Sequence, residues 1–135
     1  MKLTSIGTVH SSYKTKKEAP KQGKYANETA TIEIFPEYVE GLKDVSDLEH
    51  IVVLYWQDRS DRSVLSTKTP FSDKVYGVFA TRSPNRPNPI ALCVGKVISV
   101  QNNKLEVTGL DALDESAVLD IKVYSSLLDT DKSVK

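Results

Sequence analysis

Hydrophobic and polar residues alternate along much of the chain, and a period of two residues is typical of β-strands that bury one face. Between residues 29 and 35 the alternation places Ile32 and Ile34 on one face, and residues 104–109 repeat the pattern. Residues 51–56 form a continuous apolar run, as expected for a strand that is covered on both faces. The chain therefore predicts mainly β-structure.

Residues 90–100 form the longest segment with this period, and they separate large side chains from small ones. One face carries Ile90, Leu92, Val94, Ile98 and Val100. The opposite face carries Val97 and the small residues Ala91, Cys93, Gly95 and Ser99. A face of small side chains is typical of a tightly curved sheet or of close backbone approach.

Three further segments, residues 3–9, 74–81 and 117–125, bring the expected number of strands to about seven. In the last of them the side chains of one face are Leu119, Ile121 and Val123. Strands at such short spacing favour a closed or nearly closed barrel.

Turns and helices are few. Asn102-Asn103 predicts a tight hairpin turn, because Asn tolerates a positive φ. Residues 45–49 predict one short helical turn with Asp44 as its cap. The expected fold is a single small barrel with few short helices.

Composition is ordinary for a globular protein. The chain has 135 residues, of which 39% are hydrophobic and 27% charged. This length fits one domain, which we place at residues 1–128, followed by a polar tail at 129–135. The single cysteine, Cys93, permits no intramolecular disulfide. Since the chain also shows no signal peptide and no apolar run long enough to cross a membrane, we expect a cytoplasmic protein.

The formal net charge is zero, but the charges are segregated along the chain. Residues 14–24 and 68–96 are mostly basic, whereas residues 37–61 and 111–120 are mostly acidic. A zero total counts mildly against a nucleic-acid binder, although folding could gather the basic segments on one face. His10 and His50 lack the neighbours of a metal motif, so we expect no metal site.

Residues 81–89 are the most unusual segment. Pro84, Pro87 and Pro89 exclude both a helix and a central strand, so the segment predicts a stiff loop. The loop presents polar side chains with little conformational freedom left to lose, as a ligand site requires. These side chains are Arg82, Asn85, Arg86 and Asn88. The alternative is an ordinary surface loop whose arginines pair with nearby acidic residues.

Residues 77–90, Gly-Val-Phe-Ala-Thr-Arg-Ser-Pro-Asn-Arg-Pro-Asn-Pro-Ile, resemble the signature of the TsaA/TrmO-like family. Other segments resemble family landmarks in the expected order, namely residues 6–9, 19–23, 40–42 and 109–114. The resemblance extends over residues 3–126. It implies a compact β-barrel that forms a homodimer and binds S-adenosylmethionine near the subunit interface. It also implies methylation of the N6 nitrogen of threonylcarbamoyladenosine, next to the anticodon of tRNA.

Family motifs imply a set of cofactor contacts, which are Pro20, Lys21, Gln22, Trp56, Gln57, Arg82, Leu92, Asp114, Glu115, Ser116 and Ala117. Arg86 and Asn88 of the loop are the expected substrate-binding residues. The chain departs from the family pattern at Glu115-Ser116, where family members carry Gly-Thr.

The residues also suit the chemistry of such a cofactor. A sulfonium cation favours an aromatic face such as Trp56, and a carboxylate favours an arginine. Methyl transfer to nitrogen releases a proton, for which Asp111 and Asp114 are the candidate catalytic acceptors. Both aspartates could instead cap a turn, and Trp56 could be a core or interface residue.

Two other functions remain open at this point. The chain could be a non-catalytic module that binds S-adenosylmethionine, or a plain RNA-binding barrel. The second alternative is weakened by the zero net charge, since RNA binders are usually basic.

Overall fold

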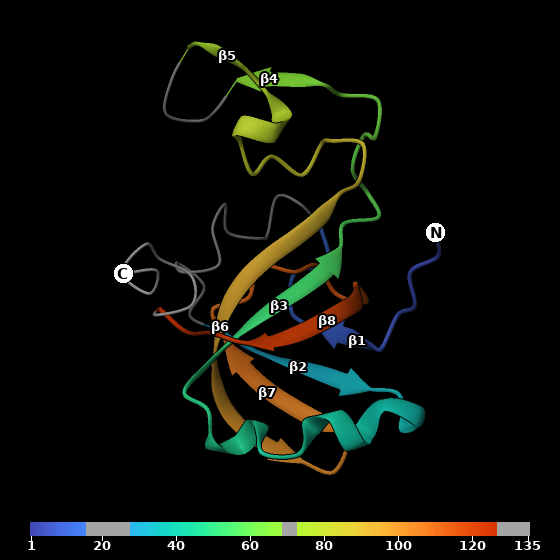
Figure 1. Ribbon diagram of the computed structural model, residues 1–135, viewed down its shortest axis with the longest axis vertical. Coiled ribbons are helices and arrows are strands. Elements are labelled where there is room, and N and C mark those ends of the chain that lie inside the picture. Colours follow the sequence, from blue (N-terminus) through green and yellow to red (C-terminus); the bar gives the residue numbers. More distant parts are fainter. Residues whose placement is uncertain (16–27, 69–72, 127–135) are drawn as a thin grey trace.

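Six antiparallel strands close into a barrel in the order β1-β2-β7-β6-β3-β8 (Figure 1). The computed structural model describes residues 1–15, 28–68 and 73–126. Within these ranges the barrel strands are β1 (Gly7–His10), β2 (Thr29–Ile34), β3 (His50–Trp56), β6 (Ile90–Gln101), β7 (Lys104–Thr108) and β8 (Ala117–Val123). The expected mainly-β barrel with few short helices is confirmed, with six strands in the barrel itself.

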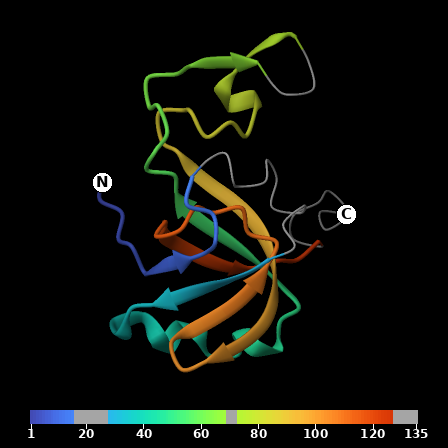
Figure 2. The same ribbon diagram turned by 180° about the vertical axis from the view of Figure 1, so that it is seen from behind.

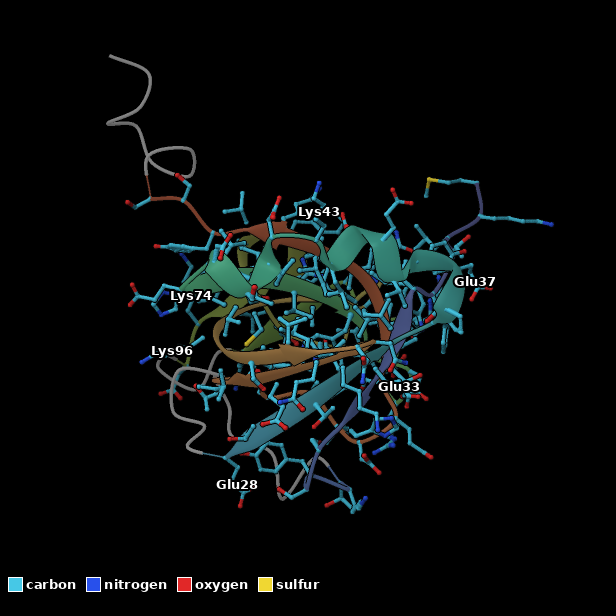
Figure 3. All side chains as sticks on the ribbon, turned by 90° about the horizontal axis from the view of Figure 1, so that it is seen from below. Glu28, Glu33, Glu37, Lys43, Lys74 and Lys96 are labelled. Atoms are coloured by element: carbon cyan, nitrogen blue, oxygen red, sulfur yellow. The ribbon has the colours of Figure 1, made fainter. Side chains whose placement is uncertain are left out.

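The two ends of the barrel are built differently (Figures 1 and 2). At one end an arm, defined here as residues 57–68 and 73–89, stands off between the end of β3 and the start of β6. It contains the hairpin of β4 (Ser66–Lys68) and β5 (Val75–Gly77), followed by the short helix η4 (Val78–Ala80). At the other end lie η2 (Pro36–Leu42) and η3 (Val45–Asp47), which Figure 3 shows across the barrel.

The core follows the alternation in the sequence. Ile32 and Ile34 of β2 point inward with Leu105 and Val107 of β7, and all four are essentially inaccessible to water. Each such side chain contributes about 1.5–3 kcal/mol on burial. The expected hairpin between β6 and β7 is also present, with Asn102 at a φ of 56°.

Up to Lys96, strand β6 turns its small residues inward and its large residues outward. Around the register shift between Val97 and Ser99, Val97 and Val100 pack against the core, so the outward face expected for Val100 was wrong. Cys93 and Gly95 face the interior, where a Cβ added to Gly95 would lie 3.3 Å from the carbonyl oxygen of Thr108. Large side chains do not fit at this close approach between neighbouring strands. The opposite face of β6 is therefore left 39% to 50% exposed at Ile90, Leu92, Val94 and Ile98.

Three other details of the expected strands were wrong. In residues 117–125, Val118 is buried and Val123 is exposed, which differs from the expected buried face. The reason is that the register between β3 and β8 is interrupted between Leu54 and Tyr55. Strand 74–81 ends at Gly77, and η4 follows it. In the apolar run 51–56, alternate residues of β3 reach the core and the others are only half-buried within one chain.

The short helical turn expected at residues 45–49 is present as η3. The expected cap was wrong, because the side chain of Asp44 makes no capping hydrogen bond. The predicted tail at 129–135 lies outside the described residues. No helix in the described ranges is long and apolar enough to cross a membrane.

Candidate functional site

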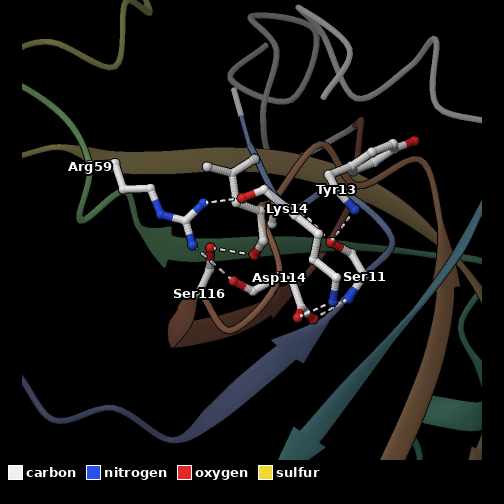
Figure 4. A network of polar contacts seen from close by, with 8 residues as sticks. Ser11, Tyr13, Lys14, Arg59, Asp114 and Ser116 are labelled. Atoms are coloured by element: carbon white, nitrogen blue, oxygen red, sulfur yellow. Dashed lines mark hydrogen bonds and ion pairs between the residues drawn. The ribbon is translucent and has the colours of Figure 1, made fainter. Parts of the chain in front are cut away.

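Three chain segments meet at the end of the barrel that carries the arm (Figure 4). Residues 11–14 follow β1, residues 57–63 follow β3, and residues 109–116 precede β8. Hydrogen bonds connect each of these segments to another, so the arm end is a joined set of loops rather than three independent ones.

The segment 109–116 is fixed mainly through its backbone. The amide of Asp114 donates to the carbonyl of Tyr13 at 2.7 Å, and the amide of Glu115 donates to the carbonyl of Val9 at 2.7 Å. The Ser116 hydroxyl donates to the carbonyl of Leu113 at 2.7 Å. Glu115 has a φ of 68°, a left-handed conformation that glycine adopts most easily. This explains why the family pattern has Gly at the position that Glu115 occupies.

The Asp114 carboxylate accepts two hydrogen bonds (Figure 4). The donors are the Lys14 ammonium at 2.5 Å and the backbone amide of Ser11 at 2.9 Å. The hydrogen bond from Lys14 is the main reason that the pKa of Asp114 lies below its usual value. A carboxylate held in its charged form is a weak base, so this geometry favours a structural role in fixing the loop.

Asp111 is half-buried and bonds to the core residue Tyr55. Its carboxylate accepts a hydrogen bond from the Tyr55 hydroxyl. Burial raises the pKa of Asp111, although the Tyr55 hydrogen bond acts in the opposite direction. Burial also raises the pKa of Cys93 to about 12, and its thiol donates to the carbonyl of Gly109 at 3.1 Å. Cys93 is therefore a protonated packing residue at neutral pH rather than a nucleophile.

Two arginines of the loop 57–63 were not predicted as site residues. Arg59 donates to the backbone carbonyls of Lys14 at 2.7 Å and of Asp114 at 3.4 Å. The Arg62 guanidinium lies 5.1 Å from the ring centroid of Trp56. No local pattern in the sequence marks these arginines, because their partners lie tens of residues away along the chain.

The arginines of the loop 81–89 differ in their surroundings. Arg86 donates to the backbone carbonyls of Thr81 at 2.9 Å and of Ser83 at 3.0 Å, so it holds its own loop together. Asn88 accepts a hydrogen bond from Arg62 at 3.3 Å. The Arg82 side chain is exposed and, within the described part of the chain, forms no hydrogen bond or ion pair with another residue. Arg82 is thus the loop arginine that is available to a ligand.

The structure brings several of the expected cofactor contacts together on adjacent strands. Trp56 of β3 pairs with Ile90 of β6 on one side and with Ala117 of β8 on the other. Leu92 lies two residues along β6, and the amide of Gln57 donates to the carbonyl of Pro89 at 2.9 Å. The expected contacts Pro20, Lys21 and Gln22 lie outside the described residues.

Two hollows in the surface lie away from these loops. One of about 350 Å³ surrounds the turn between β6 and β7, and one of about 680 Å³ lies between η2 and β8 at the opposite end. Among the described residues, no group of three or more His, Cys, Asp or Glu side chains is placed to bind a metal.

This fold and arrangement of loops define a class: a small closed β-barrel with a projecting arm. The family described as the tRNA-methyltransferase O N-terminal domain matches residues 8–130. The chain belongs to this family.

Individual relatives agree with the assignment. An S-adenosyl-L-methionine-binding protein of Archaeoglobus fulgidus is 48% identical over 129 residues, with 96% of this chain and 93% of that protein covered. A probable S-adenosyl-L-methionine-binding protein of the same organism is 47% identical, and this chain spans 36% of its length. The crystal structure of TrmO from Pseudomonas aeruginosa matches with a TM-score of 0.79 and 30% identity, and covers 96% of this chain and 58% of the TrmO chain.

The Lys14–Asp114 contact makes the stability of the fold depend on pH. The pKa of Asp114 is lower in the folded state than in the unfolded state. The contribution of Asp114 to the free energy of unfolding is therefore complete above the unfolded pKa of about 3.9, and it is lost as the pH falls through the pKa of the folded state. We expect Asp114→Asn to be less stable at pH 7, by no more than about 1 kcal/mol because Lys14 is exposed.

Urea unfolding at pH 7, 5 and 3 measures this difference. The difference in the free energy of unfolding between the native chain and Asp114→Asn should become smaller between pH 5 and 3. Glu106→Gln, at an exposed position of β7, should show no such trend. A difference for Asp114→Asn that stays constant down to pH 3 would contradict the assigned contact.

Proposed function

We propose that this chain is an S-adenosylmethionine-dependent tRNA methyltransferase that acts on the N6 nitrogen of threonylcarbamoyladenosine next to the anticodon. The observation that carries the proposal is the free Arg82 on a rigid loop, at the same end of the barrel as Trp56 and the segment 109–116. Family membership and the names of the relatives support it.

The residues present fit the cofactor. The exposed Arg82 guanidinium matches the carboxylate of its methionine part. The indole of Trp56 offers an aromatic surface for the adenine ring or the sulfonium. Ser116 and Ala117 lie next to Trp56 at the start of β8, where the backbone is already fixed. The bound cofactor supplies the reactive methyl group, and the contribution of the protein is to align donor and acceptor.

The two candidate proton acceptors have different roles in this proposal. Asp114 holds the loop through Lys14 and Ser11, and its lowered pKa makes it a poor base. Asp111 belongs to the same segment 109–116 and its pKa is raised by burial, so it is the better candidate to receive the proton that leaves the acceptor nitrogen.

The arm end also suits RNA. Cationic side chains of Lys14, Arg59, Arg62 and Arg82 surround the loops, and cations attract the phosphates of a nucleic acid. Phe79 on η4 is 82% exposed, and single-stranded RNA bases stack on such aromatic rings. A tRNA substrate also agrees with a cytoplasmic location, which forms part of the proposal.

We further propose that a second copy of the chain covers the outer face of β6. The exposed apolar side chains of Ile90, Leu92, Val94 and Ile98 form a stripe that Lys96 interrupts before Ile98, and Val52 and Leu54 of β3 lie beside it in the register. Contiguous apolar surface of this kind usually marks an interface. Leu92 belongs to both the stripe and the expected cofactor contacts, so the homodimer interface would adjoin the cofactor site.

A non-catalytic S-adenosylmethionine-binding module is the second candidate, because the names of the Archaeoglobus fulgidus relatives state binding of S-adenosyl-L-methionine and no transfer. It predicts cofactor binding without methyl transfer to tRNA. A plain RNA-binding barrel predicts RNA affinity that falls with salt and is indifferent to the cofactor.

Replacing Arg82 tests the cofactor site. Arg82→Ala should weaken S-adenosylmethionine binding at least tenfold in isothermal titration, since a hydrogen-bonded charge pair contributes about 1.5–3 kcal/mol. Lys43→Ala, which removes an exposed cation after η2 at the opposite end of the barrel, should bind as the native chain does. Absence of binding by the folded native chain would eliminate the first two candidates and leave the RNA-binding barrel.

The oligomeric state tests the proposed interface. We expect the native chain to scatter light as a dimer at micromolar concentration, and Val94→Asp to be a monomer because a charge would be buried in the apolar stripe. Glu106→Lys, which reverses a charge outside the stripe, should remain dimeric. A monomeric native chain would refute the interface.

A further inference from the structure

The loop 57–63 extends two arginines toward different parts of the site. Arg59 donates to the backbone of the segments 11–14 and 109–116, through the carbonyls of Lys14 and Asp114 (Figure 4). Arg62, three residues later, makes its hydrogen bonds with the loop 81–89 of the arm. One short loop therefore contacts both sides of the candidate site, which are the segments 11–14 and 109–116 on one side and the loop 81–89 on the other.

Arg62 combines hydrogen bonds with a contact to an aromatic ring. Its Nε donates to the carbonyl of Pro87 at 2.7 Å, and Nη2 donates to the side-chain oxygen of Asn88 at 3.3 Å. The Arg62 Cζ atom lies 5.1 Å from the centroid of the Trp56 ring. A planar guanidinium can stack and form forked hydrogen bonds at once, which a lysine ammonium cannot do.

One further hydrogen bond joins the same two loops, and two others lie within the loop 57–63. The backbone amide of Asp61 donates to the side-chain oxygen of Asn85 at 2.9 Å. The Ser63 amide and hydroxyl both donate to the Asp61 carboxylate, at 2.9 and 2.6 Å, and so fix the turn that carries Arg62. The loop 81–89 is thus held at its Asn85, Pro87 and Asn88 positions by residues of the loop 57–63.

We propose that Arg59 and Arg62 are positioning residues, and that the loop 57–63 is a brace that sets the separation of Arg82 from the segment 109–116. This inference rests on the proposed function, because that separation is what a bound S-adenosylmethionine would span. Neither arginine needs to touch the reacting atoms. Arg62 acts through Trp56 and the loop 81–89, and Arg59 acts through the backbone of Asp114.

Three variants separate the contributions of Arg62. Arg62→Met keeps the apolar stem but loses both the hydrogen bonds and the charge over Trp56. Arg62→Lys keeps a cation over the ring but loses the forked hydrogen bonds. Lys68→Met removes an exposed cation from β4 of the arm and serves as the matched control.

Isothermal titration of S-adenosylmethionine should show binding weakened about tenfold in Arg62→Met, less in Arg62→Lys, and unchanged in Lys68→Met. The thermal unfolding midpoint should be the same in all three, which separates positioning from a general loss of fold. Unchanged cofactor affinity in Arg62→Met would overturn the proposal.

The brace can also be tested without any ligand. Trp56 is the only tryptophan in the chain, so its emission should change in Arg62→Met and much less in Arg62→Lys. Amide exchange at Asp61, measured by NMR, should become faster in Arg62→Met, because the loop 81–89 is released. Lys68→Met, the matched control on β4, should leave that amide unchanged.

These ligand-free measurements keep the two proposals apart. If the native chain binds no S-adenosylmethionine, the proposed function is wrong. The role of the loop 57–63 as a brace is then tested by the amide exchange rate at Asp61 alone. Unchanged exchange at Asp61 in a folded Arg62→Met chain would refute the brace whether or not the cofactor binds.

Discussion

Close approach between strands is the constraint on which the rest of this structure depends. A Cβ added to Gly7 of β1 would overlap the carbonyl oxygen of Glu33, and one added to Gly95 would press on Thr108. Only small residues can face inward at these points of a narrow six-stranded barrel. Ile90, Leu92, Val94 and Ile98 of β6 are therefore turned outward, and this exposed stripe is a direct consequence of barrel closure.

The candidate site is rigid because hydrogen bonds attach its segments to the barrel and to each other. The segment 109–116 is tied to the rest of the molecule by side chains, since Asp111 bonds to Tyr55 of β3 and Asp114 bonds to Lys14. Arg59 joins this region to the loop that follows β3. Little reorganisation would then be needed when a ligand binds, and preorganisation of this kind is what a reaction based on alignment requires.

Local alternation predicted the strands well, because burial of one face imposes a period of two wherever the strand is regular. It failed at β8, where the irregular register opposite Leu54 and Tyr55 changes the buried face, and at 74–81, where the chain turns into η4. The stiff loop could be predicted from its prolines. The contacts of Arg59 and Arg62 could not, because they join residues tens of positions apart and depend on how the arm folds back.

Hydrogen exchange of the whole chain with and without S-adenosylmethionine tests the central claim most directly, since it locates the binding surface without any substitution. The account predicts slower exchange in residues 57–63, 81–92 and 111–117 when the cofactor is present, and no change in η2 and η3. Protection confined to the hollow between η2 and β8, or no protection anywhere, would contradict it.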